Sequence, residues 1–158
     1  MTDGSNKTCL VSGLPVISRP DWVYTGKKDG FGVEVSIIGG NILHIKARGY
    51  VNIDDQINSI RLQDQVAGTV IGENSPFIQI QDWENFKGAS NEARQYYINY
   101  LKNNDRVRGV IFCHPSFMFK MSIKLGKRLN MVPFPVYIAD DYAGAIKTAQ
   151  TLMEEMKG

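Results

Sequence analysis

The sequence lacks the features that mark several functional classes. It has only two cysteines, Cys9 and Cys113, far apart in the chain, so we expect reduced thiols rather than a disulfide framework. It also lacks a sustained basic run and any apolar run long enough to cross a membrane, and its net charge is only +2. We therefore expect no membrane span and no nucleic-acid partner. The absence of a signal-peptide pattern predicts a cytoplasmic location.

Motifs for catalysis, metal binding and cofactor binding are also missing. The segment GTVIGENS lacks the lysine of a phosphate-binding P-loop, and GGNILH matches a hairpin rather than a dinucleotide-binding turn. The histidines His44 and His114 fall in separate elements without a close Cys/His spacing. Cys113 and His114 would point to opposite faces of a continuous strand, and no Asp or Asn is placed to orient the imidazole. We predict no catalytic residue, no metal and no cofactor, with Cys113 in the core and His114 in a loop.

What the chain does contain is the composition of an ordinary globular domain. It has 158 residues, of which 43% are hydrophobic and 22% charged, enough for a sizeable core. Residues 1–21 include two prolines and two glycines and show no regular periodicity, so we expect an extended arm. Its apolar residues predict that part of the arm lies along the domain or along a neighbour. We assign residues 22–158 to a single domain.

The periodicity of the remaining chain predicts a hairpin followed by alternating helices and strands. The hairpin turns at Gly39-Gly40, between two runs of alternating apolar and polar residues. The expected later elements are a helix at 52–71, a strand at 77–80 with a polar loop at 82–89, a helix at 90–101, a strand at 107–113, a helix at 117–129, a strand at 136–139 and a helix from residue 141. This order predicts an α/β fold with a mixed sheet of about five strands, the first antiparallel and the rest parallel, covered by about four helices.

One residue conflicts with the helix expected at 52–71. Asp64 falls within the apolar line that Ile57 and Ile60 define. Either the helix bends or ends near Leu62, or a carboxylate faces the core and needs a partner, because an unpaired buried charge is costly. The sequence leaves both alternatives open.

The helix expected at 117–129 has an unusually wide apolar surface. The line expected to face the core consists of Met118, Met121, Leu125 and Leu129. Phe119 and Ile123 lie about 120° from that line, and a helix on a sheet needs an apolar arc of only about 100°. The excess predicts an exposed patch of the kind found at protein interfaces. The basic rim of this patch comprises Lys120, Lys124, Lys127 and Arg128. The alternative is that a neighbouring helix or the arm covers Phe119 and Ile123.

Four stretches resemble the STAS domain, the SpoIIAA-like fold of bacterial anti-sigma-factor antagonists. They are GGNILHIKARGYVN, SPFIQIQDWENFKGASNEARQYY, GVIFCHPSFMFKMSIKLGKRLN and FPVYIADDYAGAIKTA. The resemblance covers residues 31–156 and depends on element order more than on identities. It implies a turn before the second helix whose serine is phosphorylated by a partner kinase. Ser90 stands there if one residue is inserted, although the flanking acidic residue and glycine of the family motif are absent. Because serine is also a helix-capping residue, the resemblance leaves phosphorylation and capping both open.

The opening segment has a narrower resemblance. CLVSGLPVISRPDW and the strand pair after it resemble the region that precedes PAS and histidine-kinase domains in some bacterial sensor proteins. This implies a sensory or regulatory module whose longer parent chain would be a sensor histidine kinase. The last helix, which runs to Glu155, would then point towards the next domain.

These patterns predict a non-enzymatic regulatory or sensory module of bacterial signal transduction. It would bind another protein domain, such as a PAS, kinase or regulator domain, or a second copy of itself, through the loops at the strand carboxyl ends and the helix at 117–129. The expected interaction surface comprises Lys87, Asn91, Phe119, Lys120, Ile123, Lys124 and Lys127. One alternative is a sensor that holds a small apolar or anionic ligand near Trp83, Ser90 and His114. Another alternative is a phospho-switch at Ser90.

Overall fold

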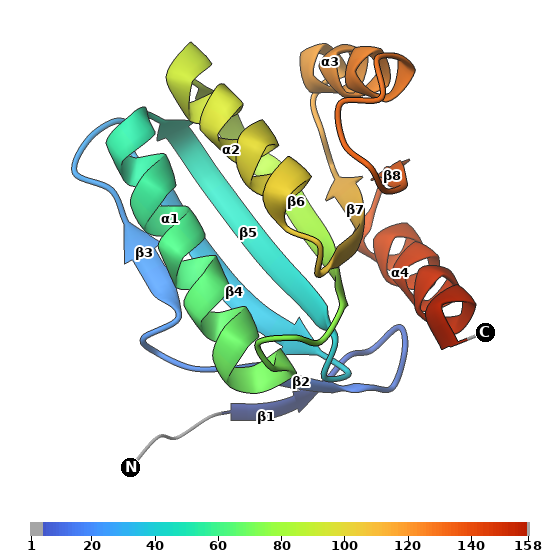
Figure 1. Cartoon of the computed structure of the whole chain (residues 1–158). Helices are drawn as coiled ribbons and strands as arrows, with labels where there is room; N and C mark the ends of the chain where they lie inside the picture. The colour runs from blue at the N-terminus through green and yellow to red at the C-terminus, as the bar shows by residue number, and fades with distance from the viewer. Residues whose placement is uncertain (1–4, 158) are drawn as a thin grey trace.

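A mixed sheet with helices on both faces organises the computed structural model, which describes residues 5–157 (Figure 1). The strands are β1 (Ser5–Thr8), β2 (Pro15–Ser18), β3 (Val23–Thr25), β4 (Gly32–Ile38), β5 (Ile42–Val51), β6 (Phe77–Ala89), β7 (Val107–Cys113) and β8 (Val136–Ala139). The helices are α1 (Ile53–Val66), which continues as the π-helix η1 (Ala67–Ile71), α2 (Asn91–Asn103), α3 (Phe117–Arg128) and α4 (Tyr142–Lys157).

The strand order is β1-β2-β4-β5-β6-β7-β8, and β3 pairs with β4 outside this path. Strands β5 to β8 are parallel, whereas β4 is antiparallel to β5. The predicted mixed α/β sheet, with its first strand antiparallel and helices covering it, is thus confirmed. Its eight strands exceed the expected number because the amino-terminal segment adds strands of its own.

The segment expected as an extended arm pairs into the sheet. Strands β1 and β2 form an antiparallel pair, and β2 continues into the sheet through the pairing of Val16 with Ile38 of β4. Apolar residues of this segment, Val11 and Leu14 among them, pack against the core on one face of the sheet. Burial of these side chains explains why the segment lies on the domain despite its weak periodicity. Residues 1–4 of the expected arm lie outside the described residues.

Two apolar cores lie on opposite faces of the sheet. Alternate residues of the central strands point to opposite sides, as Phe77 and Ile78 do in β6. One core is covered by α1 and α2, and the other by α4 and the amino-terminal segment. Strand β7 is almost entirely buried, as its continuous apolar run predicted. Among the described residues, no helix is both long enough and apolar enough to span a membrane.

Strand β6 is longer than the sequence predicted. The polar loop expected at 82–89 is wrong, because these residues continue the strand to Ala89. They pair in parallel with β5, where Asp82 lies opposite Lys46 and Ala89 opposite Val51, across two irregularities in the register. Pairing with β5 is a long-range interaction that overrides the weak strand signal of this polar stretch. The loop before α2 is therefore reduced to Ser90.

Neither alternative for Asp64 holds. Helix α1 runs past Leu62 to Val66 and then widens into η1, and Asp64 is exposed. Its carboxylate accepts a hydrogen bond of 2.5 Å from the hydroxyl of Tyr100 in α2. The carboxylate that α1 does bury is Asp55, which accepts a hydrogen bond of 2.8 Å from the Tyr24 hydroxyl.

Candidate functional site

Helix α3 contacts the rest of the domain through one row of side chains. The helix begins after Ser116, whose Oγ accepts a hydrogen bond from the backbone N–H of Phe119. Residues four apart along a helix form a row. The row Phe119, Ile123 and Lys127 points inwards, and Phe119 and Ile123 are half-buried. The orientation expected for α3 is therefore reversed, because Phe119 and Ile123 face the protein rather than solvent.

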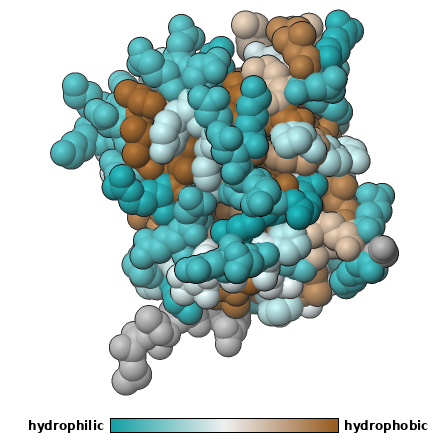
Figure 2. All heavy atoms as spheres, in the orientation of Figure 1, coloured by the Kyte–Doolittle hydropathy of each residue, from teal (hydrophilic) through white to brown (hydrophobic). Residues whose placement is uncertain are grey.

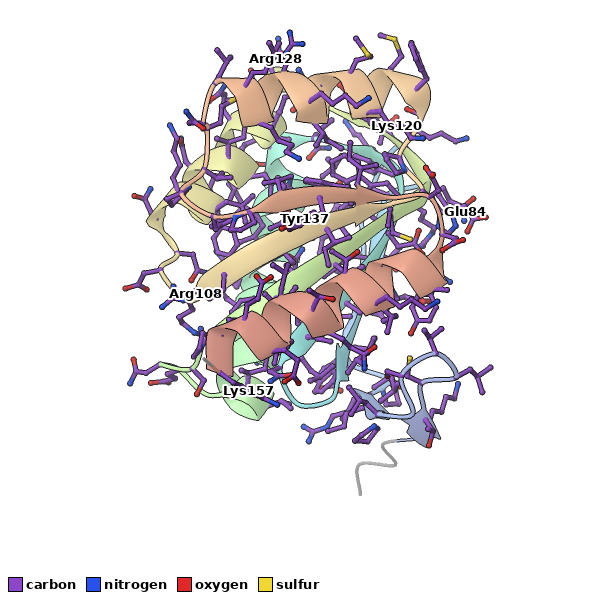
Figure 3. The ribbon with its side chains drawn as sticks, turned by 90° about the vertical axis from the view of Figure 1, so that its right-hand side faces the viewer. Glu84, Arg108, Lys120, Arg128, Tyr137 and Lys157 are labelled. Carbon is purple, nitrogen blue, oxygen red and sulfur yellow. The ribbon has the colours of Figure 1, made fainter. Side chains whose placement is uncertain are left out.

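The outward face of α3 carries the apolar line that was expected to face the core. The side chains of Phe117, Met118, Met121, Leu125 and Leu129 are between 53% and 75% exposed. No residue of α3 is fully buried. The helix lies across the upper end of the molecule, with Lys120 and Arg128 near its two ends (Figure 3). Apolar surface is visible over α3 at the upper right of Figure 2.

A cavity of about 360 Å³ lies beneath the inward row of α3. Its walls come from β6, β7, α2, α3 and the segment that leads into β8. The apolar lining includes Trp83, Phe86, Ile98, Leu101, Val110, Phe112, Phe119, Ile123, Met131, Val132, Phe134 and Val136. This volume and this apolar character are typical of small-molecule sites.

Four aromatic rings fix the end of the cavity where α3 meets the sheet. The Trp83 ring centroid lies 4.5 Å from that of Phe112 and 5.1 Å from those of Phe86 and Phe119. Phe119 stacks on Phe86 at 5.5 Å. Such pairs contribute roughly 0.5–1.5 kcal/mol each beyond their buried area. The cluster is thus a principal attachment of α3, and it joins residues that lie far apart in the sequence.

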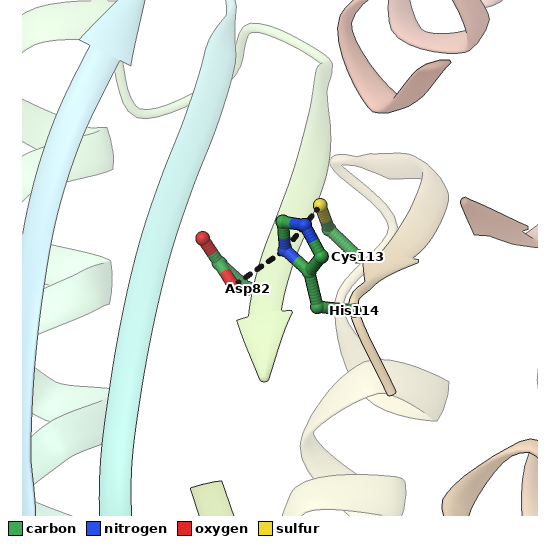
Figure 4. Close-up of side chains that lie close together, drawn as sticks. All are labelled: Asp82, Cys113 and His114. Atoms are coloured by element: carbon green, nitrogen blue, oxygen red, sulfur yellow. Dashed lines mark hydrogen bonds and ion pairs between the residues drawn. The ribbon is translucent and has the colours of Figure 1, made fainter. Parts of the chain in front are cut away.

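A second group of side chains meets on the opposite face of the sheet, where β6 and β7 run side by side (Figure 4). His114 adopts a left-handed backbone conformation, with φ of 55°, directly after β7. This break turns its imidazole back, so that Nδ1 lies 3.3 Å from Sγ of Cys113 and 3.4 Å from Oδ1 of Asp82. The expectation that no carboxylate orients this imidazole was wrong, because Asp82 does so.

This group does not have the geometry of a nucleophile–base relay. A relay uses one imidazole nitrogen for the nucleophile and the other for the orienting carboxylate, whereas here Nδ1 faces both Cys113 and Asp82. Burial raises the pKa of the Cys113 thiol to about 12, and the carboxylates of Asp82, Asp141 and Glu84 add to this effect. The thiol is therefore protonated at neutral pH and is a poor nucleophile.

Among residues 5–157, the same three residues form a group that could hold a metal ion. Their ligand atoms on Asp82, Cys113 and His114 lie within 4.8 Å of one another. A set of thiolate, imidazole and carboxylate suits zinc. Binding would have to displace the proton of a thiol whose pKa is raised.

Ser90 lies at the first turn of α2 in capping geometry. Its Oγ accepts a hydrogen bond of 3.1 Å from the backbone N–H of Ala93, and its own N–H donates to the carbonyl oxygen of Val51. The hydroxyl thus satisfies one of the free N–H groups at the helix start, as expected for an N-cap. Phosphorylation of Ser90 stays a prediction.

The other predicted site residues lie on different elements and do not form a single site. Trp83 lines the cavity, whereas His114 and Ser90 do not. Lys87 and Asn91 are exposed on β6 and at the start of α2. Lys120 forms an ion pair of 3.0 Å with Asp140, and Lys124 is exposed on α3. The ligand edge expected from Trp83, Ser90 and His114 therefore does not form as one site.

Sequence reasoning placed a possible ligand edge at Trp83, but it missed the position of the cavity beneath α3 and the contact between Asp82 and His114. The available signal for the cavity was the group Trp83, Phe86 and Phe112, aromatic residues in or beside neighbouring strands. Recognising the Asp82–His114 contact required the register that places Asp82 opposite Cys113. The exact end of a strand is the least certain part of a sequence-based prediction.

The comparisons with known proteins show the fold. No family model matches the chain, and no curated protein matches it. Among solved structures, it is similar to an uncharacterized protein of the DUF3478 family with a SpoIIAA-like fold from Shewanella loihica PV-4. The sequence identity is 13%, the match covers 80% of this chain and 98% of the other, and the TM-score is 0.60. The chain therefore has a SpoIIAA-like, STAS-like fold.

Proposed function

We propose that this chain is a non-enzymatic regulatory module that binds another protein domain through the outward face of α3. The observation that supports this proposal is the row of large apolar side chains that α3 exposes, Phe117, Met121, Leu125 and Leu129, together with Met118. Exposed apolar surface of this extent on one helix is typical of interaction sites. A PAS, kinase or regulator domain, in the same polypeptide or in another, is the class of partner that the sequence resemblance suggests.

The charges on α3 indicate which charges its partner should carry. The row Lys120, Lys124 and Arg128 borders the apolar row on one side, and no acidic residue lies between 117 and 129. The opposite border is formed by Met118, Ser122 and Gly126, which carry no charge. An apolar groove with carboxylates along one wall is complementary to this pattern. A helix that binds a bilayer surface would gain from lysines on both borders.

A second copy of the chain is a less suitable partner for this face. Two α3 helices that pack face to face would bring Lys124 and Arg128 of each copy near cations of the other, with no acidic residue of α3 to compensate. Like charges across an interface oppose association. The homodimer predicted from the sequence therefore finds little support at this surface.

Photocrosslinking from the outward face of α3 tests the proposal. A photoreactive amino acid at Met121, which is 53% exposed, should capture a protein in cells, and mass spectrometry should place the crosslink in an apolar groove with acidic residues. The same amino acid at Glu155, an exposed position on α4, is the control and should not capture that protein. Crosslinks to lipid only, to a second copy only, or to a groove without acidic residues would contradict the proposal.

The captured partner then allows a quantitative test. Leu125→Asp should weaken binding of the purified partner by at least about tenfold, because it places a carboxylate in an apolar contact. The same variant should unfold at nearly the same temperature as the wild type, since Leu125 is 56% exposed. Unchanged affinity of Leu125→Asp would remove α3 from the interface.

A further inference from the structure

The group of Asp82, Cys113 and His114 offers a carboxylate, a thiol and an imidazole, the three kinds of ligand that zinc binds in proteins. Their ligand atoms lie within 4.8 Å of one another (Figure 4). The side chains of Asp82 and Cys113 are buried, whereas that of His114 is 28% exposed. Two ligands are thus held inside the domain, and the third is accessible from solvent.

The separations between these ligand atoms are close to those of a tetrahedral zinc site. Bonds from zinc to nitrogen, oxygen and sulfur are about 2.0–2.3 Å long, so the ligand atoms of a tetrahedral site are about 3.3–3.7 Å apart. Nδ1 of His114 lies 3.4 Å from Oδ1 of Asp82 and 3.3 Å from Sγ of Cys113. Binding of zinc therefore needs small side-chain rotations rather than a rearrangement of the strands.

The sheet fixes the backbone of all three residues. The register of β6 with β7 places Asp82 opposite Cys113. The backbone N–H of His114 donates a hydrogen bond of 3.1 Å to the carbonyl oxygen of Ala139 in β8. This bond helps to hold the left-handed backbone of His114, which turns the imidazole towards the other two side chains. The ligands are therefore brought together before any ion binds, which lowers the entropic cost of binding.

The carboxylate of Asp82 is buried with little positive charge to compensate it. Its side chain is only 6% exposed. Within residues 5–157, its one ion-pair partner is His114, which carries a charge only when it is protonated. Oδ1 also accepts a hydrogen bond of 3.1 Å from the backbone N–H of Glu84. A buried carboxylate is costly unless it is paired or coordinates a metal, and a divalent cation would supply the missing charge.

We propose that Asp82, Cys113 and His114 bind one Zn²⁺ ion, with a water molecule as the fourth ligand. Binding breaks the S–H bond of Cys113, releases the proton to solvent and forms a zinc–sulfur bond, while Asp82 supplies an oxygen and His114 a nitrogen. The ion links β6 to the connection between β7 and α3, because His114 lies two positions before Ser116, the N-cap of α3. This proposal replaces the absence of a metal that we expected from the sequence.

Titration of the whole chain with Zn²⁺, after treatment with a chelator and a thiol reductant, tests the proposal. We expect saturable binding of one ion per chain. At 100 times the dissociation constant, free Zn²⁺ should raise the unfolding temperature by about 5–10 °C, because the ion binds the folded state. Mg²⁺ should not have this effect, since it prefers six oxygen ligands.

Co²⁺ in place of Zn²⁺ provides a spectroscopic test of the ligands. Co²⁺ should give the visible absorption bands of a four-coordinate ion and a near-ultraviolet charge-transfer band from the thiolate of Cys113. Neither signal depends on the outward face of α3 or on the identity of the protein partner.

The chain has two cysteines and two histidines, so these ligands have matched controls. Cys113→Ala should remove the cobalt–thiolate band, whereas Cys9→Ala, which changes the other buried cysteine, should retain it. His114→Asn should weaken Zn²⁺ binding at least about tenfold and keeps a residue that tolerates the left-handed backbone. Asp82→Asn, which preserves the side-chain shape, should weaken binding by a similar factor. His44→Gln should bind Zn²⁺ normally.

Several results would overturn the proposal. These are the absence of saturable Zn²⁺ binding, normal Zn²⁺ affinity in His114→Asn or Asp82→Asn, and a cobalt–thiolate band that persists in Cys113→Ala or disappears in Cys9→Ala. Circular dichroism of each variant without metal verifies that it is folded. Because His114 is partly exposed, His114→Asn keeps the proposal testable even if a substitution of buried Cys113 prevents folding.

Discussion

Helices α3 and α4 follow neighbouring parallel strands, yet they bury their apolar residues in opposite ways. Helix α4 follows β8 and buries Ala145, Ile146, Ala149, Leu152 and Met153 against the sheet. Helix α3 follows β7, buries no residue completely and exposes five large apolar side chains. The difference shows that an apolar stripe on a helix does not by itself predict that the stripe packs against the domain's own sheet.

The cause of this difference lies in the second apolar row of α3. Helix α4 has one apolar face, and its other side is polar or charged. Helix α3 has Phe119 and Ile123 on one side and the row that contains Leu125 on another. The aromatic cluster formed with Trp83 and Phe86 decides which side turns inwards. The larger and more regular row stays exposed.

The largest expected effect comes from removing a buried side chain of α4. Leu152 is 5% exposed, so Leu152→Ala should lower the free energy of unfolding by about 4 kcal/mol, through lost burial and the cavity left behind. Urea denaturation of the wild type and the variant measures the change. A loss below about 1 kcal/mol would mean that α4 is attached as loosely as α3.

Acid should weaken the α4 face through His44. Burial lowers the pKa of His44 to about 4, and its ring packs edge-on against Tyr142 at the start of α4. The unfolded chain takes up a proton on this histidine below its ordinary pKa of about 6.5, whereas the folded chain does so only near pH 4. Stability due to neutral His44 is therefore complete above pH 6.5 and falls by about 3 kcal/mol as the pH decreases to 4.

His44→Gln provides the control for this pH dependence. The variant cannot titrate at this position but retains Asp82 and Lys46, the other charges that act on His44. Its free energy of unfolding should fall less steeply between pH 6.5 and pH 4 than that of the wild type. Parallel curves for the two proteins would contradict the assignment to His44.

The smallest effect is expected for the matched substitution on α3. Leu125→Ala removes the same atoms as Leu152→Ala, but Leu125 is already 56% exposed. The free energy of unfolding should change by less than about 0.5 kcal/mol. Urea denaturation with the same protein preparation measures this difference directly. A loss close to that of Leu152→Ala would show that the outward face of α3 is covered in solution.

The element order was predictable from the sequence because it depends on local patterns. The hairpin at Gly39-Gly40, the buried strand β7 and the position of Ser90 as the N-cap of α2 all follow from neighbouring residues. The orientation of α3 was not predictable in this way. Its two apolar rows are equally plausible as the inner face, and only contacts with Trp83 and Phe86, more than 30 positions away, distinguish them.

The candidate site follows the same pattern. Trp83 was identified from the sequence, and it does line the cavity. The group of Asp82, Cys113 and His114 depends on the left-handed backbone of His114 and on the register of β6 with β7. The local periodicity of the sequence predicts neither the backbone conformation of His114 nor this register.

The two outer strands of the sheet, β1 and β8, are only four residues long. A strand from another molecule that aligned with either side would find few free backbone groups to pair with, and β1 presents the polar sequence Ser-Asn-Lys-Thr. Growth into fibrils by edge-to-edge addition is thereby disfavoured. The exposed apolar helix is thus combined with short sheet edges, which offer little surface for strand addition.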